Sequence, residues 1–181
     1  MVLPRVPKGR GRRKNYVRAL VAGAGIGGLA AAIAIRQAGH GVAVFEQAER
    51  LEELGAGLAV SANARKALAM LGLHERVAAR GADGTRLVLR SSDGTLLSEF
   101  SLDPGDASLG IHRADLQEEL IHALGAEHVR LAARCTGCEE HADGVTLHIA
   151  DASPEHGDFL IGADGIRSVI RADLYGEERL R

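Results

Sequence analysis

The segment from Gly23 to Gly28, with the sequence GAGIGG, constrains the fold more than any other feature of the 181 residues. Gly23, Gly25 and Gly28 fit the spacing Gly-x-Gly-x-x-Gly, in which the first glycine permits a tight turn from a strand into a helix. The second lets a phosphate approach the backbone, and the third lets the helix pack closely on the strand. The first amide groups of such a helix are unpaired and lie at the positive end of its dipole. The segment therefore predicts a turn that binds the pyrophosphate of a dinucleotide.

The residues on both sides of this segment support the same interpretation. A strand is expected over Tyr16–Val21, and the Ala-, Leu- and Ile-rich run Leu29–Ala38 is expected to form a helix that Gly39 ends. The apolar run Gly41–Phe45 is typical of a buried parallel strand, and Glu46 follows it. An acidic residue at this position is placed to accept hydrogen bonds from an adenosine ribose. The order of elements predicts a dinucleotide-binding βαβ unit.

The uncharged apolar run Ala19–Ile35 allows a different interpretation, in which this segment crosses a membrane. Two of its glycines have the Gly-x-x-x-Gly spacing of packed membrane helices, and Arg12-Arg13 precedes it as in a twin-arginine export signal. However, the run is shorter than the roughly 20 residues that a spanning helix needs, and clustered glycines weaken a helix. A membrane helix also leaves the strand Val42–Glu46 unexplained. We therefore expect a cytoplasmic protein and no contact with a membrane.

Basic residues are concentrated at the amino-terminal end of a chain whose net charge is −2. Residues 1–18 carry seven of the 22 Lys and Arg residues and none of the 24 acidic residues. A basic arm can contact nucleic acid or an anionic surface, but the prolines and glycines among these charges favour a disordered arm over residues 1–15. Aromatic residues make up only 3% of the chain, which argues against stacking surfaces for single-stranded nucleic acid. We expect no nucleic-acid partner.

The chain has two cysteines, Cys135 and Cys138, in a Cys-x-x-Cys spacing. So few cysteines exclude a disulfide-rich secreted scaffold. The pair has no second Cys-x-x-Cys and does not stand at the expected start of a helix, as a zinc or redox motif requires. We therefore expect both to be ordinary strand residues in a reducing compartment, and we expect no metal site.

The middle of the chain is expected to contain short helices and strands without an internal repeat. A helix is predicted over Asn63–Leu71, which Gly72 would end, and an amphipathic helix is predicted to run to Leu124. The Asp-Gly pairs at residues 93–94 and 143–144 are typical of hairpin turns. Strands are expected over Thr85–Arg90, Thr95–Phe100, Val129–Ala133, Thr136–Glu140, Val145–Ile149 and Asp158–Ile161, the last of them buried.

A second glycine-anchored site, Gly162-Ala163-Asp164-Gly165, lies far downstream of the first. Together with it, six further stretches form a pattern: Val21–Leu29, Val44–Glu46, Gly55–Leu58, Asn63-Ala64, Leu71–Leu73 and His112–Leu116. In order and spacing, these stretches resemble the FAD-dependent aromatic-ring monooxygenases of the para-hydroxybenzoate hydroxylase type, also called class A flavoprotein hydroxylases. The resemblance covers nearly all of Tyr16–Arg171, and its Asp-Gly motif is more specific than the glycine turn.

This resemblance implies an α/β fold, a Rossmann-like FAD-binding domain with a mostly parallel sheet and a small antiparallel segment. It assigns residues 16–181 to this domain and residues 83–108 to the start of a substrate-side sheet. Glu46 would bind the adenosine ribose, and Arg113 would pair with phosphate along the ribityl–pyrophosphate portion of FAD. Asp164 would lie in the Asp-Gly site, which in the family supports both flavin and NAD(P)H binding. The pyrophosphate would be held by the backbone of Gly23, Ala24, Gly25, Ile26, Gly27 and Gly28.

The resemblance also implies the chemistry of a monooxygenase, which belongs mainly to the flavin. In the family, NAD(P)H reduces FAD, oxygen adds at its C4a position, and the hydroperoxide hydroxylates a small aromatic substrate. The protein binds the flavin, excludes water and positions the substrate. No catalytic residue is therefore assigned in this chain.

The chain departs from the family in ending at Arg181, soon after the Asp-Gly motif. It lacks the family's second Gly-Asp motif and most of the substrate-binding part, and Glu52 stands where many relatives have an arginine. We expect the FAD-binding portion of a truncated or split enzyme, which would need a missing C-terminal half or self-association for turnover. Two alternatives stay open: a non-catalytic dinucleotide-binding module or gene remnant, and a plain NAD(P)-dependent reductase, which leaves the Asp-Gly motif unexplained.

Overall fold

The computed structural model describes residues 16–51, 56–103 and 107–176. These residues belong to two units, one formed by residues 1–52 with 120–181 and the other by residues 53–119. The predicted basic arm, residues 1–15, lies outside the described residues, as does Glu52. In the part of the chain that the structure describes, no helix is long and apolar enough to cross a membrane.

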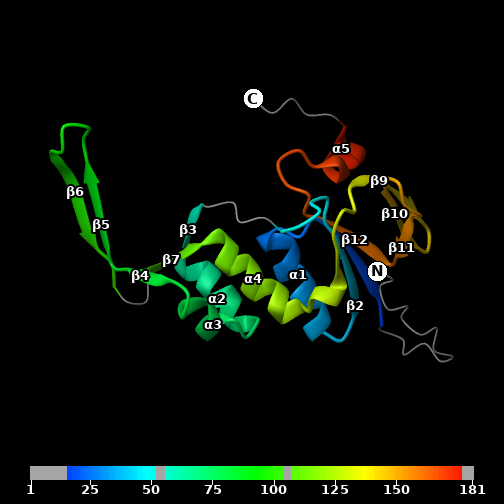
Figure 1. Ribbon diagram of the computed structural model, residues 1–181, viewed down its shortest axis with the longest axis horizontal. Coiled ribbons are helices and arrows are strands. Elements are labelled where there is room, and N and C mark those ends of the chain that lie inside the picture. Colours follow the sequence, from blue (N-terminus) through cyan, green and yellow to red (C-terminus); the bar gives the residue numbers. More distant parts are fainter. Residues whose placement is uncertain (1–15, 52–55, 104–106, 177–181) are drawn as a thin grey trace. The chain divides into compact units, whose positions relative to one another are not determined.

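A parallel sheet forms the centre of the first unit (Figure 1). Its strands, in spatial order, are β12 (Phe159–Gly162), β1 (Arg18–Ala22), β2 (Gly41–Phe45) and β8 (Val129–Arg130). β1 pairs along its whole length with β2 on one side, and β12 pairs with its last four residues on the other. β1 and β2 are buried from their second residue onward, because layers of structure cover both of their faces. This burial explains why both sequences are almost continuously apolar.

Helix α1 (Ile26–Gln37) packs on this sheet with Leu29, Ala32 and Ile33, all of which are buried. The helix is followed by Gly39 at a φ of +86°, a conformation that glycine adopts without steric cost. The apolar run Ala19–Ile35 is therefore divided between a strand and a helix, and the predicted βαβ unit is confirmed.

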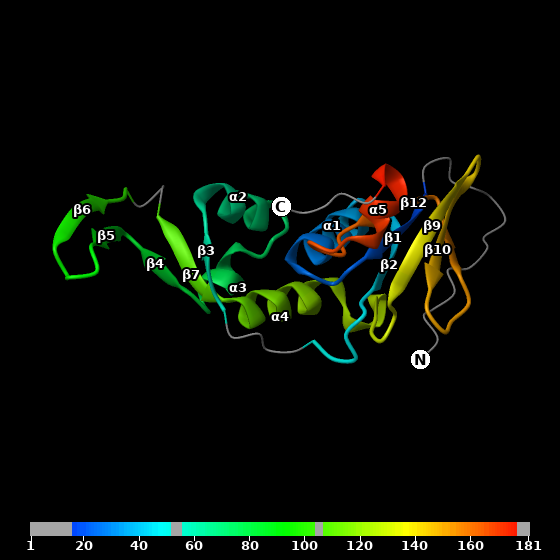
Figure 2. The same cartoon turned by 90° about the horizontal axis from the view of Figure 1, so that it is seen from above.

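Three antiparallel strands complete the first unit: β9 (Cys135–His141), β10 (Gly144–Ile149) and β11 (Glu155–Gly157). Figure 2 shows β9 and β10 beside β12 and helix α5 (Val169–Tyr175). Elsewhere in this unit, a short 3-10 helix, η1 (Ala126–His128), leads into β8. Leu147 and Ile149 of β10 share one core cluster with Leu20, Phe45 and Ile170. The antiparallel strands therefore cover one face of the parallel sheet.

The second unit contains a three-stranded antiparallel sheet, a hairpin and helices. The sheet has the spatial order β3 (Gly57–Val60), β7 (Ser108–His112) and β4 (Ala82–Gly84). The helices are α2 (Ala62–Met70), α3 (His74–Ala78) and the part of α4 (Arg113–Leu124) that precedes Leu120. Residues 83–108, expected to begin a substrate-side sheet, lie in this unit, and that expectation stays a prediction.

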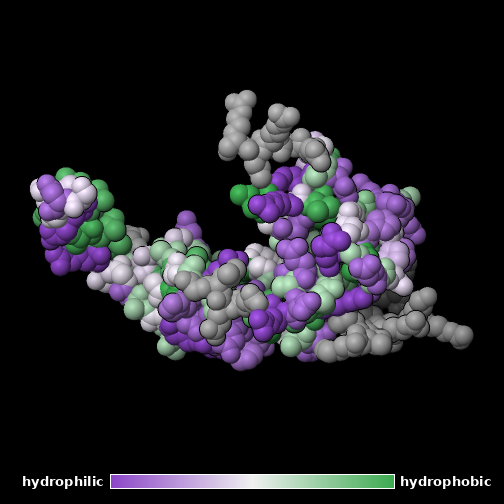
Figure 3. Space-filling view, turned by 45° about the horizontal axis from the view of Figure 1, so that its top comes forward, coloured by the Kyte–Doolittle hydropathy of each residue, from purple (hydrophilic) through white to green (hydrophobic). Residues whose placement is uncertain are grey.

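The hairpin, made of β5 (Arg86–Arg90) and β6 (Leu96–Ser101), exposes an apolar face. Leu87 lies opposite Phe100, and Leu89 lies two residues further along the same face. All three side chains are more than half exposed, and Figure 3 shows a hydrophobic surface on this hairpin at the left of the view. At the turn, the Ser91 hydroxyl donates to Asp93 and so lowers the pKa of that carboxyl to about 2. The predicted hairpin is thus confirmed, with one apolar face open to solvent.

Two predicted strands differ from the structure. The strand expected over Val129–Ala133 stops at Arg130, because the chain turns at Ala132 with a φ of +51°. The strand expected to be buried over Asp158–Ile161 is β12, which lies at an edge of the parallel sheet. Because no strand in the described ranges covers its outer side, Phe159 is 38% exposed.

The two cysteines are free thiols on β9 and pack against the core cluster. Burial raises the pKa of the Cys135 thiol to about 11, and the nearby carboxylates of Asp164 and Glu46 act in the same direction. Burial also raises the pKa of Cys138. Protonated thiols are poor nucleophiles and metal ligands, so both fit the prediction of ordinary strand residues. Among the described residues, no group of three or more His, Cys, Asp or Glu side chains is arranged to hold a metal ion.

We expect iodoacetamide to alkylate Cys135 slowly in the folded protein at pH 8, since only about 0.1% of a thiol with this pKa is ionised there. The rate should rise about tenfold per pH unit while the protein stays folded, and it should reach that of an ordinary thiol in urea. Mass spectrometry of the labelled peptides measures both rates. Equal labelling of folded and unfolded protein at pH 8 would contradict the structure.

Candidate cofactor-binding site

The turn after β1 brings three backbone segments into direct contact. Gly23 has a φ of +102°, and a Cβ built there would lie 2.3 Å from the carbonyl oxygen of Ala163. A Cβ at Gly28 would lie 2.1 Å from the carbonyl oxygen of Gly23. The amide of Gly23 also donates to the carbonyl of Phe45 at 2.7 Å, and the amide of Ala163 donates to that of Ala22 at 2.8 Å. Only glycine therefore fits at positions 23 and 28. The contacts and hydrogen bonds of this turn hold the ends of β1, β2 and β12 together.

The other side of this turn is open. Apart from the adjacent residues and the backbone of the helix itself, no atom of the described residues lies within 4 Å of a Cβ built at Gly25 or Gly27. The helix begins at Ile26, and no side chain caps its amide groups. The amide of Leu29 donates to the carbonyl of Gly25 at 2.9 Å, so the amides before it precede the helical hydrogen bonds. Phosphate oxygens can approach these amides and the positive end of the helix dipole without meeting a side chain. The residues present therefore fit a dinucleotide pyrophosphate.

Glu46 follows β2 and lies beside the same turn. Its Oε2 accepts a hydrogen bond from the buried amide of Ala24 at 2.8 Å, and its Oε1 accepts one from the amide of Ala48 at 3.0 Å. The backbone amide of Glu46 donates to the carbonyl of Arg130 on β8 at 2.9 Å. The half-buried carboxylate is thus held in one orientation. Each of its oxygens keeps a lone pair that can accept a hydrogen bond from a hydroxyl group.

Asp164, in the second glycine-anchored site, caps the helix that follows it. Its Oδ1 accepts from the hydroxyl of Ser168 at 2.6 Å, and its Oδ2 accepts from the amides of Val169 at 2.7 Å and Ile170 at 3.2 Å. The hydroxyl oxygen of Ser168 in turn accepts from the amide of Arg171 at 2.9 Å. Two side chains therefore satisfy the first amides of α5, with the carboxylate at its positive end. The sequence motif did not reveal this capping role.

The structure brings three predicted parts of the site together in the first unit. Residues 23–28, Glu46 and Asp164 follow the carboxyl ends of β1, β2 and β12, which are neighbours in the sheet (Figure 1). Ala163 makes the connection, because its carbonyl lies against Gly23 and its Cβ would lie 3.2 Å from one built at Gly28. Ligands of parallel α/β sheets bind outside the carboxyl ends of the strands. The predicted residues are therefore at the edge where such a ligand is expected.

Arg113 lies in the second unit, where it begins α4 as the sequence predicts. Its amide donates to the carbonyl of Ala56 at 3.0 Å, which fixes the start of the helix. Within the ranges that the structure describes, its half-buried guanidinium has no hydrogen bond or ion pair. All of its side-chain donors are thus available to an anion.

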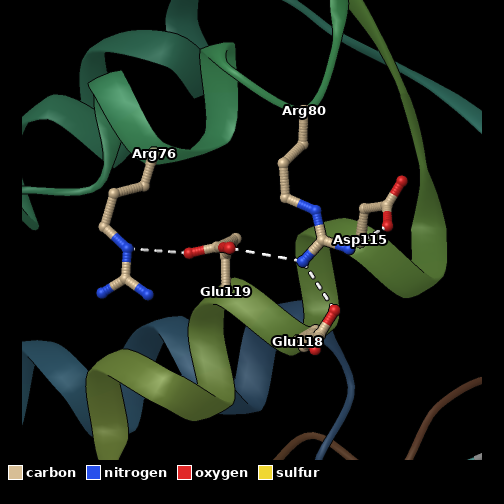
Figure 4. A network of polar contacts seen from close by, with 5 residues as sticks. All are labelled: Arg76, Arg80, Asp115, Glu118 and Glu119. Atoms are coloured by element: carbon tan, nitrogen blue, oxygen red, sulfur yellow. Dashed lines mark hydrogen bonds and ion pairs between the residues drawn. The ribbon is translucent and has the colours of Figure 1, made fainter.

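An ion-pair network that sequence analysis did not predict holds the first turns of α4 to α3 (Figure 4). Arg80, just after α3, pairs with three carboxylates of α4: Asp115, Glu118 at 2.6 Å and Glu119 at 3.3 Å. Arg76 lies 2.8 Å from the other oxygen of Glu119. The hydrogen bond with Glu118 is the main cause that raises the pKa of Arg80. The signal in the sequence was the spacing of one helical turn between Arg76 and Arg80 and between Asp115 and Glu119.

Comparisons with known proteins agree with this geometry. A family described as an FAD binding domain matches residues 16–179. An FAD-dependent urate hydroxylase of Klebsiella pneumoniae is 37% identical, over 88% of this chain and 43% of that protein. A 3-amino-4-hydroxybenzoate 2-monooxygenase of Streptomyces cremeus is 39% identical, over 87% of this chain and 42% of that protein. The chain therefore spans less than half the length of the curated relatives that it matches.

The fold is also similar to that of a solved structure. A Klebsiella pneumoniae protein complexed with FAD and uric acid superposes with a TM-score of 0.78 and 36% identity. The match covers 86% of this chain and 41% of that one. It confirms the predicted α/β fold with a parallel sheet and smaller antiparallel sheets.

We expect Gly28→Ala to lower the free energy of unfolding by about 1–3 kcal/mol or more, since its Cβ would overlap the carbonyl of Gly23. The matched change Gly27→Ala meets open space in the same helix and should be neutral, or stabilising by up to about 1 kcal/mol. Urea unfolding followed by circular dichroism measures both. Equal effects of the two substitutions would show that the close contact is not formed.

Replacing Asp164 by Ala should lower the free energy of unfolding by about 1–2 kcal/mol, because α5 loses its cap. Asp164→Asn keeps an acceptor oxygen and should cost less. Asp103→Ala, at an exposed residue, is the control and should change little. Thermal or urea unfolding without any nucleotide makes this comparison. If Asp164→Ala unfolds like the control, the carboxylate does not cap α5.

Proposed function

Because the chain belongs to the FAD-binding domain family, we propose that it forms the FAD-binding portion of a class A monooxygenase that hydroxylates a small aromatic substrate. The observation that carries this proposal is the turn at residues 23–28. It is closed by backbone contact on one side and open at the start of α1 on the other. This geometry leaves room for a pyrophosphate beside unpaired amides.

Each proposed contact with FAD uses a group whose position is known. The pyrophosphate lies against the amides of residues 25–28, where the helix dipole favours negative charge. Glu46 accepts hydrogen bonds from the hydroxyl groups of the adenosine ribose, while it keeps the hydrogen bonds from the amides of Ala24 and Ala48. Arg113, considered within the second unit alone, offers unpaired guanidinium donors that suit a phosphate. Asp164 orders the segment after β12 by capping α5, and so positions the Asp-Gly motif beside the glycine turn.

In this family FAD supplies the redox chemistry when it is bound, with NAD(P)H as its reductant. The residues of this chain bind and orient the cofactor, and none is assigned a catalytic role. The chain spans less than half the length of its curated relatives, and we propose that turnover also uses a part that corresponds to the rest of them, or self-association. We further propose that the substrate is aromatic. We also propose that the protein is located in the cytoplasm, because free thiols such as Cys135 persist in a reducing compartment.

The same turn at residues 23–28 also suits a second candidate function. The chain would then be a non-catalytic module that binds the ADP portion of a dinucleotide. In this case only the proposed phosphate contacts at residues 25–28 and the proposed ribose contact at Glu46 would bind the ligand, and the flavin ring would contribute nothing to its affinity. Competition between ADP and FAD distinguishes this candidate from the first.

Titration of the purified chain with FAD, followed by flavin fluorescence, tests the proposal. Gly25→Asp places a carboxylate in the open space at the start of α1 and should weaken FAD binding by about tenfold or more, or ~1.4 kcal/mol. Glu46→Gln should weaken FAD and ADP binding alike, because both ligands contain the ribose. Glu99→Gln, on the hairpin of the second unit, is the matched control and should leave both affinities unchanged.

Three outcomes of this titration are informative. FAD affinity that exceeds ADP affinity and falls in the Gly25 and Glu46 variants supports the monooxygenase portion. Equal affinities for ADP and FAD support the non-catalytic module. A folded chain that binds neither ligand, or binds FAD equally well after Gly25→Asp, would overturn the proposed site.

A further inference from the structure

The position of Arg113 depends on a direct junction between a strand and a helix in the second unit. β7 ends at His112 and α4 begins at Arg113, so no loop residue separates the two elements. On the strand side, His112 pairs with Gly57 of β3, and the amide of Arg113 donates to the carbonyl of Ala56. The direction of the Arg113 side chain is therefore set by how the first turns of α4 are held.

Arg80 lies beside this junction because of the residues that follow it. A Cβ built at Gly81 would lie 2.7 Å from the carbonyl oxygen of Gly110 on β7, so the backbone after Arg80 packs directly on that strand. The next residue, Ala82, begins β4 and pairs with Gly110. Arg80 is thus fixed between the end of α3 and the strand that continues into α4.

From this place Arg80 binds one face of α4, as Figure 4 shows. Asp115, Glu118 and Glu119 share that face because Asp115 is separated from the other two by three and four residues, and all three pair with Arg80. Arg113 is two residues from Asp115, a spacing at which the side chains of a helix do not face each other. The carboxylates are therefore bound by Arg80 on a different face of the helix from Arg113.

We propose that Arg80 is a positioning residue for the contact between Arg113 and a phosphate of FAD. It fixes the first turns of α4 and so holds the guanidinium of Arg113 in an orientation that is open to an anion. This inference rests on the proposed function, because the phosphate is that of FAD. A single exposed ion pair contributes little, but here one guanidinium joins three carboxylates, and Glu119 is only 8% exposed. A side chain that is already oriented loses less conformational freedom when its ligand binds.

A double-mutant cycle on FAD affinity tests whether Arg80 acts through Arg113. Arg80→Gln should weaken FAD binding by about fivefold or more in the parent chain, and by less than about twofold where Arg113→Gln is already present. Arg86→Gln is the matched control, since it also removes an arginine of the second unit that is paired with a carboxylate, that of Glu99. The control should leave FAD affinity unchanged.

Glu118→Gln distinguishes positioning from an effect of charge alone. The Glu118 side chain is 53% exposed, so this variant should keep the fold and its circular dichroism spectrum. If the network acted on FAD only through its charges, the loss of a carboxylate would strengthen the binding of this anion. We expect weaker binding, because Arg80 loses a partner that holds it on α4.

A measurement without FAD examines the junction itself. The amide of Arg113, which is bonded to the carbonyl of Ala56, should exchange its hydrogen faster in Arg80→Gln than in Arg86→Gln. Equal exchange in the two variants would overturn the inference, since Arg80 would not order the start of α4.

The binding data can overturn the inference in two further ways. Arg80→Gln could weaken FAD binding equally with and without the Arg113 side chain, or Glu118→Gln could strengthen it. Both results leave the proposed function standing as long as Gly25→Asp weakens FAD binding. A folded parent chain that binds no FAD would instead overturn the proposed function, and this inference with it. If Arg80→Gln does not fold, Glu118→Gln takes its place in the cycle.

Discussion

The backbone contact between Gly23, Gly28 and Ala163 is the constraint on which the first unit depends. Because no side chain separates these residues, the ends of β1 and β12 and the start of α1 meet at one point. The contact fixes the direction in which α1 leaves the sheet, and the buried residues Leu29 and Ile33 then pack on the strands. The same scarcity of side chains leaves the outer side of the turn open. Tight packing and access for a ligand therefore have one physical cause.

The two carboxylates near this turn also organise the backbone around it. Glu46 accepts hydrogen bonds from two amides, one of them from Ala24 in the turn, and Asp164 accepts from two amides of α5. Side chains held in this way lose little conformational freedom when a ligand binds. The structural role of Glu46 is therefore compatible with ribose binding, because a carboxylate can accept more than two hydrogen bonds.

Each unit presents apolar strands that its own described residues do not cover. In the first unit this is β12, and in the second it is the hairpin face formed by Leu87, Leu89 and Phe100. A two-stranded hairpin is marginally stable by itself, and parallel sheets are usually covered at their edges. Both features suit a chain that spans less than half the length of its curated relatives. In both units, apolar strand surface therefore stays exposed in the part of the chain that the structure describes.

The sequence alone determined the βαβ unit, the hairpin turns and the family, because glycine spacing, Asp-Gly turns and apolar periodicity are local properties of the chain. It also placed Arg113 at the start of a helix and the cysteines in a strand. Only the tertiary structure decided that β12 is an edge strand, that Asp164 caps α5, and that Arg80 joins three carboxylates of α4. These features depend on which distant segments become neighbours. Exposure and hydrogen-bond partners are set by those neighbours in space, and a linear pattern of residue types does not contain them.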